Sequence, residues 1–526
     1  MRHAHRAGNL RRMVRGWYTV SVTSVVVVLA YLSLFRGNFD HIADDPGLGW
    51  HLADGALITS TGRVPVADPF LAPAKVANPY VPVDAPRKWV NDQWLSDVIL
   101  FNLYSLGGWP LLYGVVAALF LVAYFGILGD GLTKSGQGGI LVILATLIAF
   151  KVGQVHLIVR PVIFSIFLFP LVLRRVTALM KRVDISWREI GRESMVLCPL
   201  FVLWANLHPA FVNGLCVIGL AVLAQALRGR AGRSSAFRWT ALGLLCFAVT
   251  VCTPNGPALY DSIAQLTGSS YFLSLLMEWY PTDLARPEGM LLMFLAVVPA
   301  VCAAILPELR KRVSVFELLV ALCFFMQALW AVRHVPFASF ACLPLWAACF
   351  GGGAVVPKRS VFALTGRVFS RIGEREARSP VNGLTSSVFV ALVGLLVVVS
   401  RPESVLPSLV GSVHERQLKE LFAKVDTSHS EGVVLASLNW GGAIIHLLGP
   451  RYKPIVDDRT VVVGEALYRA SLESFRRPAT FEELFTTFGV THVLAPSEDD
   501  LSWYLRDKRD WTERASLHGT SLFVHQ

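Results

Sequence analysis

The chain has 526 residues, of which 54% are hydrophobic and 16% are charged, and its formal net charge is +11. Because soluble globular proteins carry about 25% charged residues, this composition excludes an ordinary soluble protein and predicts an integral membrane protein. The positive charge does not indicate nucleic acid binding, since most basic residues lie in loops between apolar runs. The eight cysteines lie in or beside these runs and lack the spacing of a zinc site or a disulfide framework.

The first 16 residues are polar and contain five arginines. The apolar run 17–35 has no small-residue cleavage site behind it, so we expect a retained transmembrane helix rather than a signal peptide. Since a helix needs about 20 apolar residues to cross the hydrocarbon layer, the sequence predicts about eleven transmembrane helices. The expected spans are 17–35, 109–128, 138–156, 161–179, 194–207, 210–227, 237–253, 288–306, 314–332, 335–355 and 384–400.

The first long polar loop, 36–108, has eight Asp against five Lys and Arg, and it is rich in Pro, Trp and Tyr. Its segment Asp92–Tyr104 has the pattern of an amphipathic helix at the membrane interface. Loops of this length between structured elements are typically functional.

The tail, Arg401–Gln526, is too polar to cross a membrane, with 14 Lys and Arg against 17 Asp and Glu. Strand-like runs at 432–437, 454–456 and 490–494 are each followed by a helical pattern, and two closing strands lie near Ala515 and Leu522. This order predicts a small α/β domain.

Basic residues predict the orientation, because short basic loops stay in the cytoplasm. With the N-terminus inside, the segments expected on the inner side contain 25 Lys and Arg, and the loops expected on the outer side contain 8. The expected protein is thus an α-helical polytopic membrane protein with a cytoplasmic N-terminus (1–16), a transmembrane domain (17–400) whose outer loop is 36–108, and an extracytoplasmic α/β domain (401–526).

Ionisable residues at the ends of spans tend to be functional, and here they gather on the outer side. We therefore expect any active site to face outward at the membrane surface. The candidates are Asp44, Asp45, His51, Asp68, Arg160, His208, Glu278, Arg333 and His334.

Three stretches of the first outer loop carry a family resemblance: Asp44-Asp-Pro-Gly-Leu-Gly-Trp-His-Leu-Ala-Asp-Gly, Gly62-Arg-Val-Pro-Val-Ala-Asp-Pro-Phe and Trp89-Val-Asn-Asp-Gln-Trp-Leu. They resemble the first outer loop of bacterial multi-spanning glycosyltransferases of the C-type (GT-C) superfamily, relatives of protein mannosyltransferases. Shorter matches follow at Arg160-Pro, Trp204-Ala-Asn-Leu-His, Thr253-Pro-Asn-Gly, Glu278-Trp, Arg333-His-Val-Pro-Phe, Trp440-Gly-Gly and Val456-Asp-Asp-Arg. Two positions depart from the pattern, because Gly47 replaces a second acidic residue and Gln93 stands where Glu is common.

The resemblance implies a GT-C-like fold and a transferase of the bacterial inner membrane. Its donor would be a sugar linked to polyprenyl phosphate, and its acceptor a glycan, lipid or protein. Membrane lipids are the other expected partners, and nucleic acid is not one. The resemblance names no particular cofactor, and a divalent metal stays an open alternative.

Transfer needs a carboxylate that accepts the proton of the acceptor hydroxyl and cations that hold the leaving phosphate. Asp45 matches the first acidic position of the motif and is the first choice for the base, with Asp44 and Asp68 behind it. The expected phosphate ligands are Arg160, Arg333 and His334, and the other expected substrate contacts are His51, His208 and Glu278.

Each role has a structural alternative. The aspartates near prolines could shape turns, and the arginines could anchor lipid head groups. Asp457-Asp-Arg459 in the tail has the pattern of a structural ion pair.

Two other functions compete with catalysis. A transporter or flippase would predict ionisable residues deep within several spans, where only Lys151 and a few glutamines lie. A non-catalytic partner in envelope polysaccharide assembly is favoured by Gly47, since loss of a carboxylate is typical of a site that has lost activity.

Overall fold

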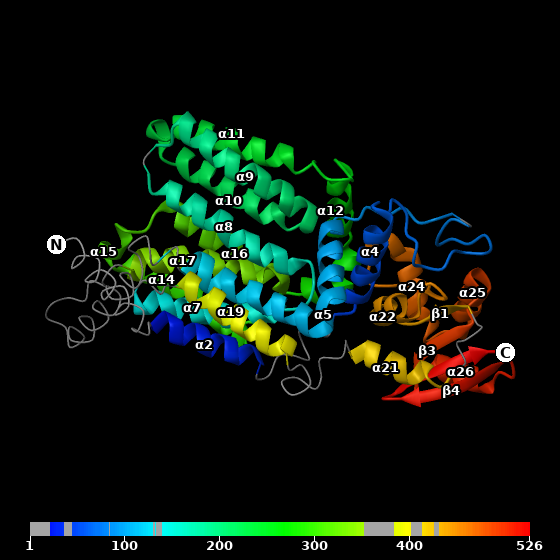
Figure 1. The fold of residues 1–526 in the computed structure, drawn as a ribbon. Coiled ribbons are helices and arrows are strands. Elements are labelled where there is room, and N and C mark those ends of the chain that lie inside the picture. Colours follow the sequence, from blue (N-terminus) through cyan, green and yellow to red (C-terminus); the bar gives the residue numbers. More distant parts are fainter. Residues whose placement is uncertain are drawn as a thin grey trace, which may run out of the picture.

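The structure is a computed structural model, and it describes residues 22–35, 45–83, 85–129, 132, 139–182, 184–351, 383–400, 413–425 and 431–526. In these residues the chain is mainly helical and has one five-stranded sheet near its C-terminus. Asp44, a candidate catalytic residue, lies outside the described residues. Figure 1 shows the long helices side by side in a bundle, with the sheet domain at one end.

Every expected apolar run coincides with a helix of this bundle in its described part. Four helical segments are long and apolar enough to cross a membrane: Trp94–Gly129, Val162–Met180, Trp187–Leu207 and Pro287–Ile305. The other bundle helices are shorter, so eleven crossings remain a prediction. The bundle consists of α2 (Val22–Phe35), α5 (Trp94–Leu121), η1 (Val122–Gly129), α7 (Ile140–Gly153), α8 (Val162–Met180), α9 (Trp187–Leu207), α10 (Phe211–Ala226), α11 (Arg233–Val249), α14 (Pro287–Ile305), α16 (Val315–Trp330), α17 (Val335–Phe350) and α19 (Gly383–Ser400).

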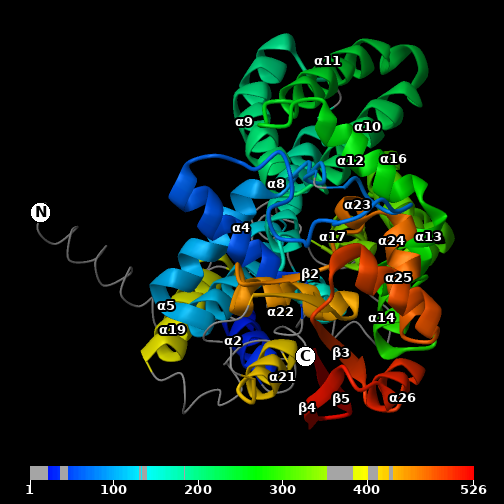
Figure 2. The same ribbon diagram turned by 90° about the vertical axis from the view of Figure 1, so that its right-hand side faces the viewer.

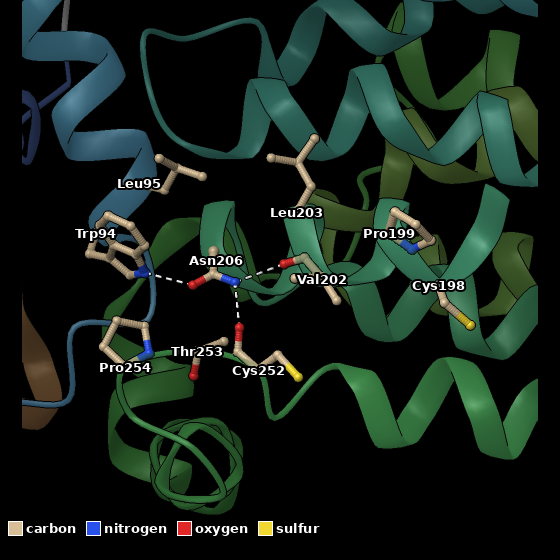
Figure 3. A pocket seen from close by; sticks show the side chains of 10 residues that line it. All are labelled: Trp94, Leu95, Cys198, Pro199, Val202, Leu203, Asn206, Cys252, Thr253 and Pro254. Carbon is tan, nitrogen blue, oxygen red and sulfur yellow. Dashed lines mark hydrogen bonds between the residues drawn. The ribbon is translucent and has the colours of Figure 1, made fainter. Parts of the chain in front are cut away.

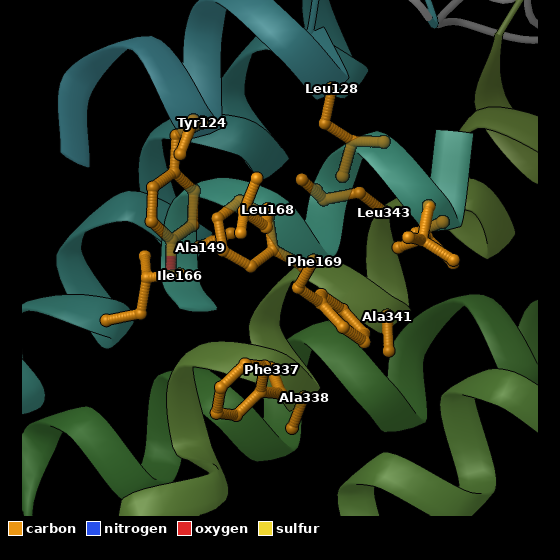
Figure 4. Packing of buried hydrophobic residues seen from close by; sticks show 14 of the residues in the cluster. Tyr124, Leu128, Ala149, Ile166, Leu168, Phe169, Phe337, Ala338, Ala341 and Leu343 are labelled. Atoms are coloured by element: carbon orange, nitrogen blue, oxygen red, sulfur yellow. The ribbon is translucent and has the colours of Figure 1, made fainter. Parts of the chain in front are cut away.

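The bundle core is built around α17, whose side chains are nearly all buried. Phe337 packs edge-on against Phe169 of α8, with ring centroids 5.2 Å apart, and Figure 4 shows this packing. Tyr124 stacks on Phe340 at 3.9 Å, and its hydroxyl hydrogen-bonds the Ser339 hydroxyl at 2.8 Å. The aromatic layers fix the positions of α8 and α17, and two candidate arginines, Arg160 and Arg333, lie just before the first residues of these helices.

Short elements connect the long helices. They are η3 (Gln154–His156), η4 (Gly229–Ala231), α12 (Ala258–Gly268), α13 (Ser270–Leu275), η5 (Met277–Trp279), α15 (Pro307–Arg310) and η6 (Val332–His334). In Figure 1, α12 lies at the same end of the bundle as the sheet domain, and α15 lies at the opposite end.

The 36–108 segment forms α4 (Leu48–Thr61), an extended stretch and the first part of α5. The helix predicted at Asp92–Tyr104 is present and begins at Trp94. α5 bends at Gly107 and Gly108, which have non-helical backbone angles, so its first part lies across the end of the bundle (Figure 1). α4 packs closely on α5, since a Cβ on Gly55 would lie 2.1 Å from the Asp97 carbonyl oxygen.

The tail forms the small α/β domain that the sequence predicts. Its sheet has the order β2-β1-β3-β5-β4, in which β1 is parallel to β2 and β3, and β5 is antiparallel to β3 and β4. The strands are β1 (Gly432–Leu435), β2 (Tyr452–Pro454), β3 (His492–Pro496), β4 (Trp511–Leu517) and β5 (Thr520–His525). The helices are α21 (Val413–Phe422), α22 (Leu438–Leu448), α23 (Thr460–Val463), α24 (Glu465–Ser474), α25 (Pro478–Phe488) and α26 (Asp500–Asp507).

The tail and the 36–108 segment share one hydrophobic core. Trp50, Leu71 and Trp89 belong to the same buried cluster as Leu435 and Phe481 of the tail. Figure 2 views this end of the molecule and shows α22 beside α4. The tail is therefore packed onto the loop segment that carries most of the candidate aspartates.

Candidate functional site

Arg160 binds three carboxylates that come from three distant parts of the chain. Its Nε lies 2.9 Å from Asp45 Oδ2, its Nη1 lies 3.1 Å from Glu278 Oε2, and its Nη2 lies 3.0 Å from Asp458 Oδ2. Glu278 also binds Arg333, with Nη1 3.0 Å from Oε1. We call Asp45, Arg160, Glu278, Arg333 and Asp458 the Arg160 site.

Short connections at the end of the bundle position these side chains. Arg160 directly precedes Pro161, which caps α8, and Glu278 lies in η5. Arg333 lies in η6, between α16 and α17, and its guanidinium group lies 4.3 Å from the Trp279 ring centroid. Helix ends fixed by a packed bundle thus hold both arginines.

Gly47 makes room for the carboxylate that the tail contributes. A Cβ on Gly47 would lie only 2.6 Å from Asp458 Oδ2, and the Gly47 amide donates to Asp45 Oδ1 at 2.7 Å. Trp50 Nε1 donates to the other oxygen of Asp458 at 2.7 Å. Asp458 therefore occupies the space beside Asp45 that a side chain at position 47 would need.

Burial and charge act in opposite directions on these groups. Burial opposes ionisation of Glu278, but Arg333 and Arg160 outweigh it and lower its pKa to about 2. Burial likewise opposes the charge of Arg160, and Asp45, Glu278 and Asp458 together raise its pKa. Burial raises the pKa values of Asp45 and Asp458 above the usual range. A carboxylate that is more basic than usual is suited to accept a proton.

His51 lies beside the Arg160 site and belongs to a buried polar network. Its Nδ1 lies 2.6 Å from Asp97 Oδ1. Asn91 Nδ2 donates to Asp97 Oδ2 at 3.0 Å and to Asp54 Oδ2 at 2.6 Å. We call His51, Asp54, Asn91 and Asp97 the His51 network.

Asp68 lies apart from Arg160, in a second ion cluster. Its carboxylate accepts the amide hydrogens of Phe70 and Leu71 at 3.3 and 2.9 Å, as a turn-forming aspartate does. It also pairs with Arg459 of the tail at 2.9 Å. Arg459 lies over the Trp89 ring, 4.6 Å from its centroid, so this cluster joins the tail to the 36–108 segment.

The two remaining histidines contact neither Arg160 nor Asp45 by a hydrogen bond in the described residues. His208 ends α9, and its Nδ1 lies 2.9 Å from the Ser165 hydroxyl. His334 packs beside Trp330 and Trp279, and burial lowers its pKa to about 4. Both lie near Arg333, whose charge disfavours their protonation.

An apolar groove opens where α5 begins and α9 ends, with a volume of about 820 Å³. Figure 3 shows its lining, which includes Leu95, Val202 and Leu203. Its polar edge is Asn206, which accepts from Trp94 Nε1 at 2.8 Å and donates to the Cys252 carbonyl at 2.9 Å. Three residues away from Cys252, Asn255 donates to the Asn91 carbonyl at 2.6 Å, which connects the groove wall to the His51 network.

Among the described residues, no group of three or more His, Cys, Asp and Glu side chains is arranged to hold a metal ion. The Arg160 site itself has two arginines among its carboxylates, which makes it a poor cation site.

The structure thus brings together Asp45, Arg160, Glu278 and Arg333 from the sequence candidates. Sequence reasoning missed Asp458, Asn91, Asp54 and Asp97. The signals for Asp458 were the Trp440-Gly-Gly and Asp457-Asp-Arg459 segments of the tail. Asn91 lies within the quoted Trp89 stretch, and Asp97 lies two residues after its end.

The sequence was compared with protein-family models and with curated proteins, and neither comparison found a match.

Proposed function

We propose that this protein is a polytopic membrane glycosyltransferase that acts at the outer face of the membrane. Its donor would be a sugar on polyprenyl phosphate and its acceptor a glycan, lipid or protein. The observation that carries the proposal is the Arg160 site, where two arginines and three carboxylates meet at one end of an apolar bundle.

In the proposed reaction, the acceptor hydroxyl attacks the anomeric carbon of the donor sugar. The bond from that carbon to the phosphate oxygen breaks, and the hydroxyl proton passes to Asp45. The polyprenyl phosphate leaves with the electron pair, and Arg160 and Arg333 stabilise its charge, since guanidinium groups form strong charge-assisted hydrogen bonds to phosphate.

Asp458 supports the proposal because it supplies a second carboxylate beside Asp45. The resemblance leads one to expect an acidic residue at position 47, where this chain has glycine. The side chain of Asp458 fills that space, so the site has two neighbouring carboxylates despite Gly47.

The groove beside Trp94 supports a lipid-linked donor. Its lining is mostly apolar, and it lies between the start of α5, which belongs to the 36–108 segment, and the end of α9. An isoprenoid chain is a suitable occupant, because it would bury apolar surface there.

The proposed topology has eleven crossings, a cytoplasmic N-terminus and the tail outside. The basic α15 end of the bundle would then face the cytoplasm, and the Arg160 site would lie at the outer surface.

One observation favours the second candidate, a non-catalytic partner in envelope assembly. All three guanidinium nitrogen atoms of Arg160 are already bound to carboxylates. Ion networks with a purely structural role also shift the pKa values of their members. In that case Arg160 would only fix the tail to the bundle.

The deciding experiment measures binding of undecaprenyl phosphate to the full chain in nanodiscs. Arg333→Ala is expected to weaken binding by about 1–3 kcal/mol, the cost of one charged hydrogen bond, and Arg333→Lys to recover part of it. Arg160→Lys tests the second arginine, because an alanine there would leave three buried carboxylates without a partner. Arg286→Ala, at a largely exposed arginine, is the control. Unchanged affinity in both Arg333→Ala and Arg160→Lys would contradict a lipid phosphate site.

A further inference from the structure

Another cavity lies between the tail and α13, and we call it the tail pocket. Its volume is about 710 Å³, within the range of about 300–1,000 Å³ that is usual for small-molecule sites. Tyr271 of α13 lies on one side, where the Arg469 guanidinium group of α24 is 3.8 Å from its ring centroid. None of the lining residues belongs to the Arg160 site.

The tail pocket lies at the carboxyl ends of two neighbouring strands. β1 ends at Leu435 and β3 ends at Pro496, and the two strands are parallel. Ser437, two residues after β1, lines the pocket together with Ala495 and Pro496 at the end of β3. The cavity is therefore at the edge of the sheet where both strands end.

The helices beside these strands cover opposite faces of the sheet. Val434 of β1 belongs to the same buried cluster as Ile444 of α22, whereas the next residue, Leu435, belongs to the same cluster as Leu467 of α24. Successive side chains of a strand point to opposite faces, so α22 and α24 lie on different faces. Open α/β sheets bind ligands outside the carboxyl ends of strands where the helices diverge in this way. The topology and the cavity thus indicate the same place.

Three arginines line the tail pocket, and they differ in their partners. Arg469 pairs with Glu465, and Arg477 pairs with Glu473. The side chain of Arg476 makes no hydrogen bond or ion pair with the residues that the structure describes. A guanidinium group without such a partner favours an anionic ligand, because it binds carboxylate and phosphate groups through charge-assisted hydrogen bonds.

The lining also has groups that suit hydroxyls. Asp499 contributes a carboxyl group, on which the charge of Arg476 acts, but the two side chains do not form an ion pair. Ser437 and Thr520 contribute hydroxyl groups. Trp440 is 7% exposed, and its indole N–H makes no hydrogen bond within the described ranges. The pocket therefore offers both donors and acceptors beside one unpaired arginine.

We propose that the tail pocket binds an acidic sugar, a carbohydrate unit that carries one carboxylate. Arg476 binds the carboxylate, and Asp499 accepts hydrogen bonds from hydroxyls of the sugar. A bare inorganic anion would be repelled by Asp499 and could donate little to it, and a phosphate ester, with its charge of about −1.5 to −2 at pH 7, would be repelled more than a carboxylate. Because the tail pocket shares no residue with the Arg160 site, this inference does not depend on the proposed function.

The test measures binding of trigalacturonic acid to the full chain in nanodiscs by calorimetry. The methyl ester of this trisaccharide is the matched ligand, since it keeps the sugar rings and lacks the charge. We expect the acid to bind about tenfold or more tightly than the ester, and Arg476→Gln to remove this advantage, the effect of one charged hydrogen bond. The unfolding midpoint should not change, because Arg476 has no partner to lose. Arg514→Gln, at an exposed arginine of β4 that does not line the pocket, is the control.

Asp499→Ala separates a sugar from a bare anion. Without the carboxyl group the sugar hydroxyls lose an acceptor, so trigalacturonic acid should bind more weakly. Inorganic phosphate, in contrast, would bind more tightly once the repulsion is removed. Tighter binding of trigalacturonic acid to Asp499→Ala would contradict the assigned contact and overturn the proposal.

Three further results would overturn it: no measurable binding of the acid, equal affinities for acid and ester, or the same loss in Arg514→Gln as in Arg476→Gln. Glucose 6-phosphate or inorganic phosphate binding more tightly than the acid would do so as well.

Binding of undecaprenyl phosphate distinguishes the tail pocket from the proposed donor site. Arg476→Gln should leave this affinity within about twofold, as expected for independent sites. A loss as large as that of Arg333→Ala would assign Arg476 to the lipid phosphate and overturn the proposal. If instead the arginine variants of the Arg160 site leave lipid binding unchanged while Arg476→Gln weakens binding of the acid, the proposed donor is wrong and the tail pocket is supported.

Discussion

Gly442 of the tail lies directly against Pro46 of the 36–108 segment. A Cβ on Gly442 would come within 2.1 Å of the Pro46 carbonyl oxygen, and one on Gly49 within 2.0 Å of the Gly442 carbonyl oxygen. Backbone contact this close requires glycine on both sides. The Trp440-Gly-Gly segment therefore explains how α22 docks on α4 and brings Asp458 to Arg160.

Gly442→Ala is expected to loosen this docking, because the added methyl group must push α22 away from Pro46. Overpacking of this kind costs about 1–3 kcal/mol, so the thermal unfolding midpoint should fall. Gly268→Ala is the control, since nothing lies within 4 Å of a Cβ there. Equal midpoints for both variants would show that the tail does not rest on this contact.

Asp54 predicts a specific pH dependence of stability. Its pKa rises from 3.8 to about 9 in the folded protein, so the folded state binds the proton more tightly than the unfolded state. This stabilisation is complete below pH 3.8 and is lost as the pH rises toward 9.

Asp54→Asn removes this titrating group. The stability of the variant relative to the unmodified protein should therefore increase as the pH rises from 3.8 toward 9. The difference in free energy of unfolding should change by at most about 1.4 kcal/mol per pH unit. Unfolding followed by tryptophan fluorescence at several pH values measures it. A difference that is constant with pH would mean that Asp54 is ionised in the folded protein.

Much of the bundle could be predicted because apolar length and loop charge are local properties of the sequence. In its described part each apolar run coincides with a helix, and the strand-helix order of the tail is present. The Arg160 site was only partly predictable, because its ion pairs join residues up to 298 positions apart. Asp458 was interpreted as part of a structural ion pair, and no local pattern shows that Gly47 leaves room for it.

The environments of Asp45 and Asp68 predict different effects of the same substitution. Asp45→Asn should abolish transfer and leave expression intact, since an amide cannot accept the proton. Asp68→Asn should instead lower stability by about 1–3 kcal/mol, the cost of a lost charged hydrogen bond, because Asp68 binds Arg459 and two turn amides. Transfer from polyprenyl-phosphate-linked sugars and thermal unfolding are measured on both variants. Loss of transfer in folded Asp68→Asn, with Asp45→Asn active, would assign the base to Asp68.

The proposed orientation can be tested with reporter fusions. A fusion at Gly383 should report the cytoplasm, and one at Gln526 should report the outside, because the basic loops are concentrated on one side. An external signal at Gly383, or a cytoplasmic one at Gln526, would move the Arg160 site to the other membrane face and exclude an outward-facing transferase.

The relation between Gly47 and Asp458 gives the sharpest test of the shared site. Gly47→Asp should destabilise the protein, because its Cβ would lie 2.6 Å from Asp458 Oδ2 and the new carboxylate would add a fourth negative charge around Arg160. Asp458→Gly alone should also destabilise it, since Arg160 and Trp50 each lose a partner.

The double variant Gly47→Asp/Asp458→Gly restores both the space and the number of carboxylates. If the two positions supply one carboxylate to the same place, the double variant should be more stable than either single variant, and the coupling should exceed the roughly 0.3–0.5 kcal/mol scatter of independent sites. Binding of undecaprenyl phosphate should recover in parallel. If the losses of stability of the two single variants simply add in the double variant, Asp458 acts only by docking the tail. Positions 47 and 458 would then not supply one shared carboxylate beside Arg160.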